Sequence, residues 1–315
     1  MNFKHSLLGL CFLFLVGGGP TAATPLQNPS PRVAVSITPF YALVAAVMQG
    51  VGTPQLLIQK GSCPHEYALK PSEAQHLHAA DIIFWAGPGL ETFLVKSLAT
   101  IEMHHPHSIV TLEQTPGLHR LPQQQNAEGS KHDHNHVHHH PHSIDMHFWL
   151  DPQNAIALTD NIVQQLSLID PNHATLYHQN GQALKERLRN LDEKIAQTLK
   201  AVKHVPFIVF HDAYQYFAKR YELTVAASIT AHPEVPPSAK RINTVRKIIQ
   251  ESHAHCIFTE PNLQPKLVNS LAQEFSLKIG ELDPVGSASN DNPDGYFQLL
   301  QQLTESVHAC LQKAE

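Results

Sequence analysis

Short apolar segments alternate with longer amphipathic segments along most of the chain. The apolar segments are uninterrupted and rich in Val, Ile, Leu and Phe, which is typical of strands that are buried on both faces of a parallel sheet. Strands are predicted over residues 33–37, 55–58, 82–85, 108–112, 207–210, 223–227, 256–259 and 277–282. Helices are predicted over 39–50, from an N-cap at Ser72, after Asp151-Pro152, and over 172–200, 241–251 and 297–311. This order predicts an α/β fold with mainly parallel sheets flanked by helices.

One predicted helix, over residues 172–200, is much longer than the others. Its apolar residues recur at helical spacing, at Leu176, Leu184, Leu188, Leu191, Ile195 and Leu199. At 1.5 Å per residue it would be roughly 40 Å long, the length of a whole lobe. We therefore predict two lobes, residues 32–168 and 203–315, joined by a linking helix over 171–202.

A polar segment interrupts the first lobe at residues 116–142. It consists mainly of Gln, Asn, Gly, Lys, Asp and His. Such a composition buries too little apolar surface to offset the entropy lost on ordering. We predict a flexible, histidine-rich insertion.

The first 23 residues have the features of a secretory signal peptide. Lys4 and His5 precede an apolar run from Leu7 to Val16, which ends in Gly-Pro and small residues. The run is too short to span a bilayer. Cys11 follows Leu10, where a lipid-attachment signal has a small residue. The expected product is a soluble periplasmic protein, cut near Ala23 and without a lipid anchor.

Composition points to a metal and away from nucleic acid. The chain has 315 residues, enough for two domains, and a formal net charge of −5. No basic stripe is present to neutralise phosphates. The sequence contains 24 histidines, an unusual number, and histidine supplies the commonest metal-binding nitrogen.

Three cysteines remain after the predicted cleavage site: Cys63, Cys256 and Cys310. An oxidising compartment favours one disulfide and leaves one free thiol. Cys256 and Cys310 both lie in the last third of the chain and are the expected pair. The sequence alone does not establish this connectivity.

Four residues form a candidate zinc site, and three of them follow predicted strands. His65 follows the turn after residues 55–58, His147 precedes a Phe-Trp-Leu-Asp-Pro segment, and His211 and Asp283 each follow a strand of the second lobe. Ligands of α/β proteins gather at the carboxyl ends of strands. Three imidazoles and one further ligand make a tetrahedral zinc site. Asp283 is the preferred fourth ligand, and a water molecule or Cys63 are alternatives.

Further histidines could bind zinc more weakly. The main group lies in the polar segment, at His132, His134, His136, His138, His139, His140 and His142. Isolated additional candidates are His104, His105, His107, His119 and His232.

An enzyme is the main alternative to a binding protein. A zinc hydrolase with a His-Glu-x-x-His helix would need a histidine at position 69, where this chain has Leu69, and no Gly-x-Ser-x-Gly motif occurs. We therefore expect no catalytic function. A lipid-anchored adhesin is disfavoured because the chain lacks the lipid-attachment cysteine, and a pure metal-storage protein would need many equivalent sites.

Several motifs resemble those of one known family. These are Gly-Ser-Cys-Pro-His-Glu-Tyr at 61–67, His-Phe-Trp-Leu-Asp-Pro at 147–152, Phe-His-Asp-Ala-Tyr at 210–214, Phe-Thr-Glu-Pro at 258–261 and Leu-Asp-Pro at 282–284. Together they resemble the cluster A-I (cluster 9) metal-binding proteins of ABC importers, and most of all the zinc-binding Znu type.

The resemblance implies two α/β lobes on one long helix, with the metal between them. It also implies that an inner-membrane ABC permease and its ATPase are the partners of a monomeric, zinc-carrying subunit. Manganese-binding members are the alternative, but they generally have a carboxylate where this chain has His211. Imidazole suits zinc better than manganese. Glu260 is expected beside the site and not on the metal.

Overall fold

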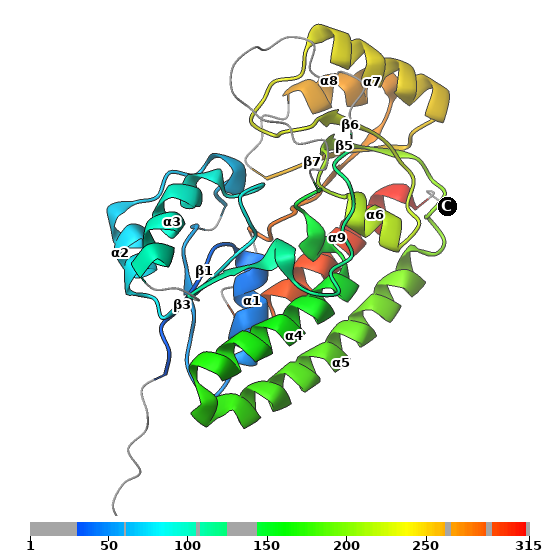
Figure 1. Ribbon diagram of the computed structural model, residues 1–315. Coiled ribbons are helices and arrows are strands. Elements are labelled where there is room, and N and C mark those ends of the chain that lie inside the picture. The colour runs from blue at the N-terminus through cyan, green and yellow to red at the C-terminus, as the bar shows by residue number, and fades with distance from the viewer. Residues whose placement is uncertain are drawn as a thin grey trace, which may run out of the picture.

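Two four-stranded parallel sheets form the framework of the protein (Figure 1). The computed structural model describes residues 30–59, 61–104, 108–124, 144–261, 266–287 and 292–312. The predicted signal peptide (1–23), His105, His107 and the seven histidines of 132–142 lie outside these residues.

The strand order places the first strand of each sheet inside the sheet. The first sheet has the order β2-β1-β3-β4 and the second β6-β5-β7-β8. The strands of the first sheet are β1 (Val33–Val35), β2 (Gln55–Leu56), β3 (Ile82–Trp85) and β4 (Ile109–Thr111). Those of the second are β5 (Phe207–His211), β6 (Val225–Thr230), β7 (Cys256–Thr259) and β8 (Lys278–Glu281). In each sheet the second strand is added on one side of the first strand, and the third strand on the other side. The order of strands therefore changes direction beside β1 and beside β5, and α/β proteins bind ligands at such points.

Alternate side chains of each central strand enter two different cores. In β5, Phe207 and Val209 belong to a large central core, whereas Ile208 and Phe210 belong to a smaller outer core. The outer core of the second sheet is covered by α7 (Ala239–Ser252) and α8 (Lys266–Phe275), and that of the first by α2 (Pro71–Ala79) and α3 (Val95–His104). Burial on both faces explains why the strands are continuously apolar.

The central core is a layer of helices that both sheets share (Figure 1). It contains α1 (Thr38–Val47), α4 (Pro152–Ile169), α5 (Ala174–Leu199) and α9 (Gly295–Leu311). The C-terminal helix α9 packs against both α1 and α5. One continuous core therefore connects the two sheets, and it fixes the position of one sheet relative to the other.

The helix α5 contains 26 residues and leads from α4 to β5. It lies along α4 (Figure 1), and a Cβ atom on Gly181 would come within 2.4 Å of Val163. The absence of a side chain at Gly181 permits this close approach. The bounds of the two predicted lobes and of the linking helix remain predictions.

Some predicted boundaries were wrong, and local hydrogen bonds explain why. Ser72 is not an N-cap: α2 starts at Pro71, and the Glu73 carboxylate accepts the backbone N–H of Lys70 at 2.8 Å. The strand predicted at 223–227 is shifted, because the N–H of Leu223 donates to Ala218 and closes the turn after α6 (Gln215–Arg220). Helices α3, α6 and α8 were not predicted.

The predicted flexible segment begins at residue 116, and its first residues, up to 124, belong to the described structure. Leu118 and Leu121 are buried in the central core, and the N–H of Leu121 donates to the hydroxyl of Tyr216. These two leucines are apolar anchors in an otherwise polar sequence.

Cys256 and Cys310 form a disulfide, as predicted, and it joins β7 to α9. Cys63 is free. None of the helices in the described ranges has the length and apolar character needed to cross a membrane.

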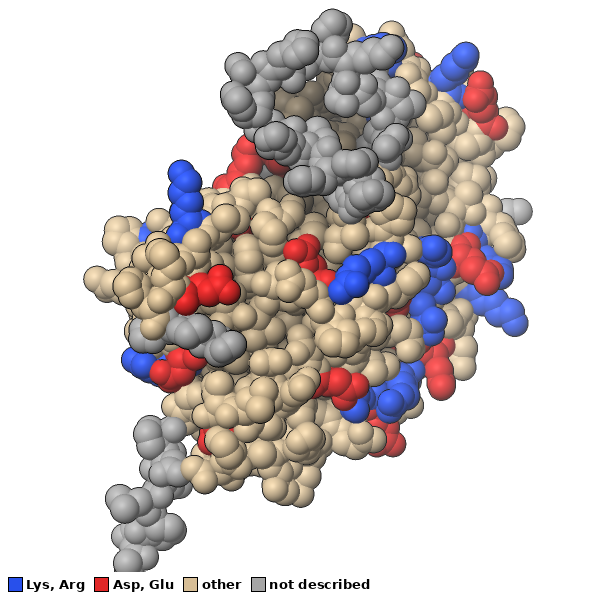
Figure 2. Space-filling model, in the orientation of Figure 1, with Lys and Arg blue, Asp and Glu red and all other residues tan. Residues whose placement is uncertain are grey.

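The surface carries charges of both signs. On the face shown in Figure 2, Lys and Arg side chains are interspersed with Asp and Glu, and wide areas carry neither.

Candidate metal centre

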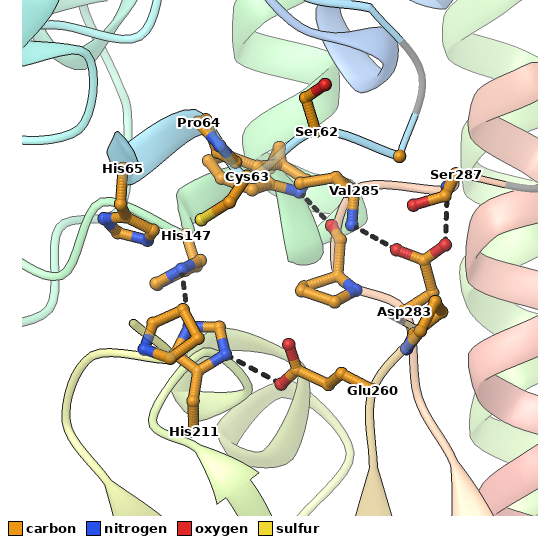
Figure 3. Close-up of a pocket in the computed structure, with 15 residues that line it drawn as sticks. Ser62, Cys63, Pro64, His65, His147, His211, Glu260, Asp283, Val285 and Ser287 are labelled. Carbon is orange, nitrogen blue, oxygen red and sulfur yellow. Dashed lines mark hydrogen bonds and ion pairs between the residues drawn. The ribbon is translucent and has the colours of Figure 1, made fainter. Parts of the chain in front are cut away.

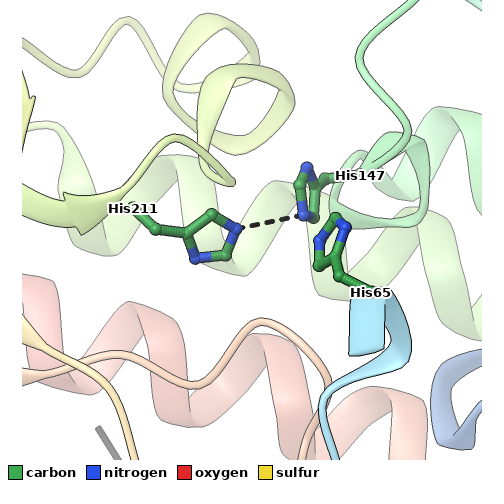
Figure 4. Close-up of side chains that lie close together, drawn as sticks. All are labelled: His65, His147 and His211. Carbon is green, nitrogen blue, oxygen red and sulfur yellow. Dashed lines mark hydrogen bonds between the residues drawn. The ribbon is translucent and has the colours of Figure 1, made fainter. Parts of the chain in front are cut away.

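Three histidines from distant parts of the sequence meet between the two sheets (Figure 4). His65 lies on a short 3₁₀ turn (Pro64–Glu66), His147 directly precedes another (Phe148–Leu150), and His211 ends β5. One ring nitrogen of each lies within 4.8 Å of the other two. The ring centres of His147 and His211 are 5.1 Å apart, and that of His65 is 5.6 and 6.0 Å from them.

His147 is held by a carboxylate two residues before it. Its Nδ1–H donates to Oδ1 of Asp145 at 2.8 Å, and its backbone N–H donates to the same oxygen at 3.0 Å. Asp145 is itself buried and accepts the side-chain amide of Gln215 through its other oxygen. This network fixes the orientation of the His147 ring.

His211 is held in the same way by Glu260. Its Nδ1–H donates to Oε1 of Glu260 at 2.7 Å, and the hydroxyl of Tyr214 donates to the same oxygen at 3.0 Å. Glu260 follows β7, the strand beside β5. Although burial disfavours a charged imidazole, the neighbouring Glu260 raises the pKa of His211 above its ordinary value.

These two hydrogen bonds leave both Nε2 atoms free to bind a cation. Nε2 of His211 and Nε2 of His147 are 3.3 Å apart (Figures 3 and 4). In neutral imidazoles with Nδ1 protonated, both atoms present lone pairs. Two lone pairs at this distance repel each other unless a proton or a metal ion lies between them. Carboxylate–histidine pairs of this kind orient the ligands of many metal sites.

His65 completes the group from the first sheet's side. It is half-buried, and its Nε2 atom is buried without a hydrogen-bond partner. Burial, together with the nearby rings of His147, His211 and His232, lowers the pKa of His65 from 6.5 to about 2. The ring is therefore neutral at physiological pH, which is the form that binds metals.

A cavity of about 150 Å³ adjoins the three imidazoles and is also lined by Cys63, Glu260 and Asp283. The carboxylate of Asp283 points away from the imidazoles (Figure 3) and accepts the backbone N–H groups of Val285, Gly286 and Ser287. In the described part of the chain, neither Asp283 nor Cys63 belongs to the group of mutually close ligand atoms.

The other predicted histidines lie in different places. His104 is exposed at the end of α3, and His119 is exposed with its ring edge against Tyr216. His232 lies near His65, with ring centres 6.2 Å apart.

Sequence reasoning missed Asp145 and Glu234. Asp145 lies two residues before His147, and Glu234 lies two residues after His232 in a His-Pro-Glu sequence. Both short spacings were visible, but a surface carboxylate near a histidine is too common to be informative without the fold.

Comparison with known proteins identifies the family of this chain. Residues 33–310 match the family model of ZnuA, the periplasmic component A of a zinc-uptake complex. The chain is 40% identical to the high-affinity zinc uptake system protein ZnuA of Brucella suis over 340 residues, covering 99% of this chain and 100% of the relative.

Two solved structures have the same fold. A crystal structure of ZnuA has a TM-score of 0.75 at 21% identity, covering 90% of this chain and 100% of the other. FpvC of Pseudomonas aeruginosa, a solute-binding protein solved with Mn²⁺, has a TM-score of 0.76 at 20% identity, covering 90% and 98% of the two chains. The family match over nearly the whole described chain, together with the full-length relative, establishes that this chain belongs to the ZnuA family of periplasmic zinc-uptake components.

Proposed function

We propose that this protein binds Zn²⁺ in the periplasm through His65, His147 and His211 and delivers it to an inner-membrane ABC permease and its ATPase. The observation that carries the proposal is the pair of Nε2 atoms 3.3 Å apart, each on a ring whose other nitrogen donates to a buried carboxylate. That arrangement suits a cation and is costly without one.

Three neutral imidazoles favour zinc over manganese, which prefers oxygen ligands. A relative solved with Mn²⁺ keeps manganese as the second candidate cargo. Asp283, a water molecule and Cys63 are the candidates for the fourth ligand. Asp283 would have to give up its bonds to the backbone of residues 285–287, so we propose water in the conformation described here.

The relatives in this family are named as zinc-uptake proteins, which favours a carrier function over a zinc-hydrolase function. A carrier needs no catalytic step. We also propose that the protein acts as a monomer after cleavage near Ala23.

Zinc competition against a chromogenic chelator tests the site. We expect His147→Ala to weaken zinc binding by more than about 100-fold, beyond the usual cost of losing only a ligand's hydrogen-bond partner. The control is His178→Ala, because His178 is exposed on α5. Mn²⁺ is titrated in parallel. Equal zinc affinity in the two variants would refute the ligand assignment, and tighter binding of Mn²⁺ than of Zn²⁺ would refute the choice of metal.

A further inference from the structure

A second group of metal-binding side chains lies beside the first and shares His65 with it. Within the described residues, ligand atoms of His65, His232 and Glu234 lie within 4.8 Å of one another. All three side chains are half-buried, whereas His147 and His211 are buried. The second group is therefore closer to solvent than the first.

The fold positions His232 and Glu234 on one anchored turn. The turn follows β6, whose last residue, Thr230, is paired with His211 of β5. The buried hydroxyl of Thr230 bonds to the backbone oxygens of His232 and Val235, at 2.8 and 3.1 Å, and the N–H of Val235 donates to His232. Pro233 restricts the backbone between the two side chains. The turn thus holds both side chains at the same edge of the sheet as His211.

Two atoms of this group lack partners in the described structure. Oε2 of Glu234 and Nε2 of His65 are both buried, and neither has a hydrogen-bond partner among the described residues. Leaving such atoms unpaired costs free energy, so native proteins seldom do so without a reason. A divalent cation would satisfy both atoms together.

We propose that His65, His232 and Glu234 form an outer zinc site, from which the ion passes to the inner site of His65, His147 and His211. Two imidazoles and one carboxylate, with a water molecule, make a tetrahedral zinc site. The carboxylate gives the outer site a negative charge that attracts the cation, and the inner site gives three nitrogen ligands.

The transfer is an exchange of ligands around His65. The bonds from zinc to His232 and Glu234 break, the bonds to Nε2 of His147 and His211 form, and the bond to His65 persists. No electron is transferred, and any proton on Nε2 of His147 or His211 leaves to solvent as the bond to zinc forms. Since both sites need His65, one zinc ion occupies one or the other, and the outer site is filled stably only when the inner one is disabled.

A cavity next to the outer site offers an approach from solvent. It is lined by His65, His232 and His147, and also by Gln123, Gln124 and Ile144, the described residues that border the histidine-rich segment. The cavity therefore gives solvent access to His65 and His232 of the outer site and to His147 of the inner site.

Zinc-edge anomalous diffraction of the full-length His147→Ala protein, crystallised with excess zinc, locates the ion. If that variant does not fold, His211→Gln replaces it, because a glutamine amide can still donate to Glu260. We expect an anomalous peak bounded by His65, His232 and Glu234. The outer-site proposal would be overturned by a peak confined to His65 and the remaining inner histidine, or by the absence of any peak near these side chains.

Chelator competition in solution supplies the quantitative test. In the His147→Ala background, we expect the further change Glu234→Gln to weaken the residual zinc affinity by at least about tenfold, because losing a direct ligand should cost no less than losing a ligand's hydrogen-bond partner. His178→Ala in the same background is the control. Residual affinity that is the same in both would overturn the proposal.

This inference rests on the proposed zinc function, and the two can fail separately. If the wild-type protein does not bind zinc tightly, or keeps its affinity in His147→Ala, the proposed function fails. If the wild type binds tightly, His147→Ala loses that binding, and Glu234→Gln changes nothing, only the outer site fails.

Discussion

His147 and His211 face each other across the space between the two sheets, with their Nε2 atoms 3.3 Å apart. His147 is held by Asp145 from a loop, and His211 by Glu260 from the end of β7. The two carboxylates fix which nitrogen of each ring is free. The site is thus arranged before any metal arrives, which lowers the ordering cost of binding.

The two carboxylates should contribute measurably to zinc affinity. We expect Asp145→Asn and Glu260→Gln each to weaken zinc binding by about tenfold or more, because the imidazoles lose a charged partner. Chelator competition measures this. Asp160→Asn is a matched control, since Asp160 is exposed and pairs only with Lys185 among the residues described. Unchanged affinity in both test variants would contradict this account of the site.

Zinc affinity should fall as the solution is acidified. The pKa of His211 is raised, so a proton competes with zinc at its Nε2 already above pH 6.5, whereas the pKa of His65, about 2, keeps that ring out of the competition. Displacing one proton costs about tenfold in affinity per pH unit below the pKa.

Glu260→Gln removes the cause of the raised pKa of His211, so the pH at which affinity begins to fall should be lower in this variant. Calorimetric titrations of both proteins between pH 5 and pH 8 test this. The same onset in both proteins would show that Glu260 does not control the protonation of His211.

An experiment can distinguish whether Asp283 stabilises the fold or binds zinc directly. Its carboxylate accepts three backbone N–H groups from residues 285–287, so Asp283→Asn should lower stability more than it lowers zinc affinity. We expect a stability loss of about 1–3 kcal/mol, since an amide cannot accept all three bonds, with less than about tenfold loss of affinity. Urea unfolding of the metal-free protein and zinc competition give the two numbers. A loss of affinity as large as that of His211→Ala would instead make Asp283 the fourth ligand.

The histidine-rich segment should bind additional zinc without being needed for the tight site. Replacing residues 125–142 with a short Gly-Ser linker should remove the weaker zinc ions and leave the first equivalent unchanged. The ends of the segment already lie together, because Pro122 and Ile144 form a β-bridge. Calorimetry of both proteins counts the ions. Should the linker variant lose the tight site, the segment itself would be the primary receptor.

The disulfide should stabilise the fold with little effect on the site. Reducing the Cys256–Cys310 bond, which spans 54 residues, should cost about 4 kcal/mol of unfolding free energy on the chain-entropy model. Zinc affinity should stay within about threefold, because the bond lies at the beginning of β7 and Glu260 follows its end. Urea unfolding and zinc competition with and without reductant test both statements. A large loss of zinc affinity would show that the bond positions Glu260.

Much of this architecture could be read from local sequence. Continuous apolar runs such as Phe207–Phe210 predict strands covered on both faces, because only a doubly covered strand has no polar side. The helix around Leu184 and Leu188 was predicted from its spacing alone. His65 and His211 could be selected because each follows a predicted strand, where α/β proteins place ligands, whereas His147 was selected from the resemblance of its His-Phe-Trp-Leu-Asp-Pro segment. The boundaries that failed, at Ser72 and Leu223, depend on single hydrogen bonds that no periodicity encodes.

The tertiary structure alone decided which side chains meet. Asp145 orients His147, and Glu260 orients His211. Asp283 turns toward its own backbone. These contacts result from how the two sheets pack on one helical layer. Glu234 shows the same limit: His232 was a candidate as an isolated histidine, but Glu234 becomes a ligand candidate beside it only because β6 ends next to β5. Local sequence determines secondary structure and the chemical type of a side chain, since those depend on neighbours along the chain. A metal site depends on distances of a few ångströms between residues far apart in sequence, and only the packed fold sets those distances.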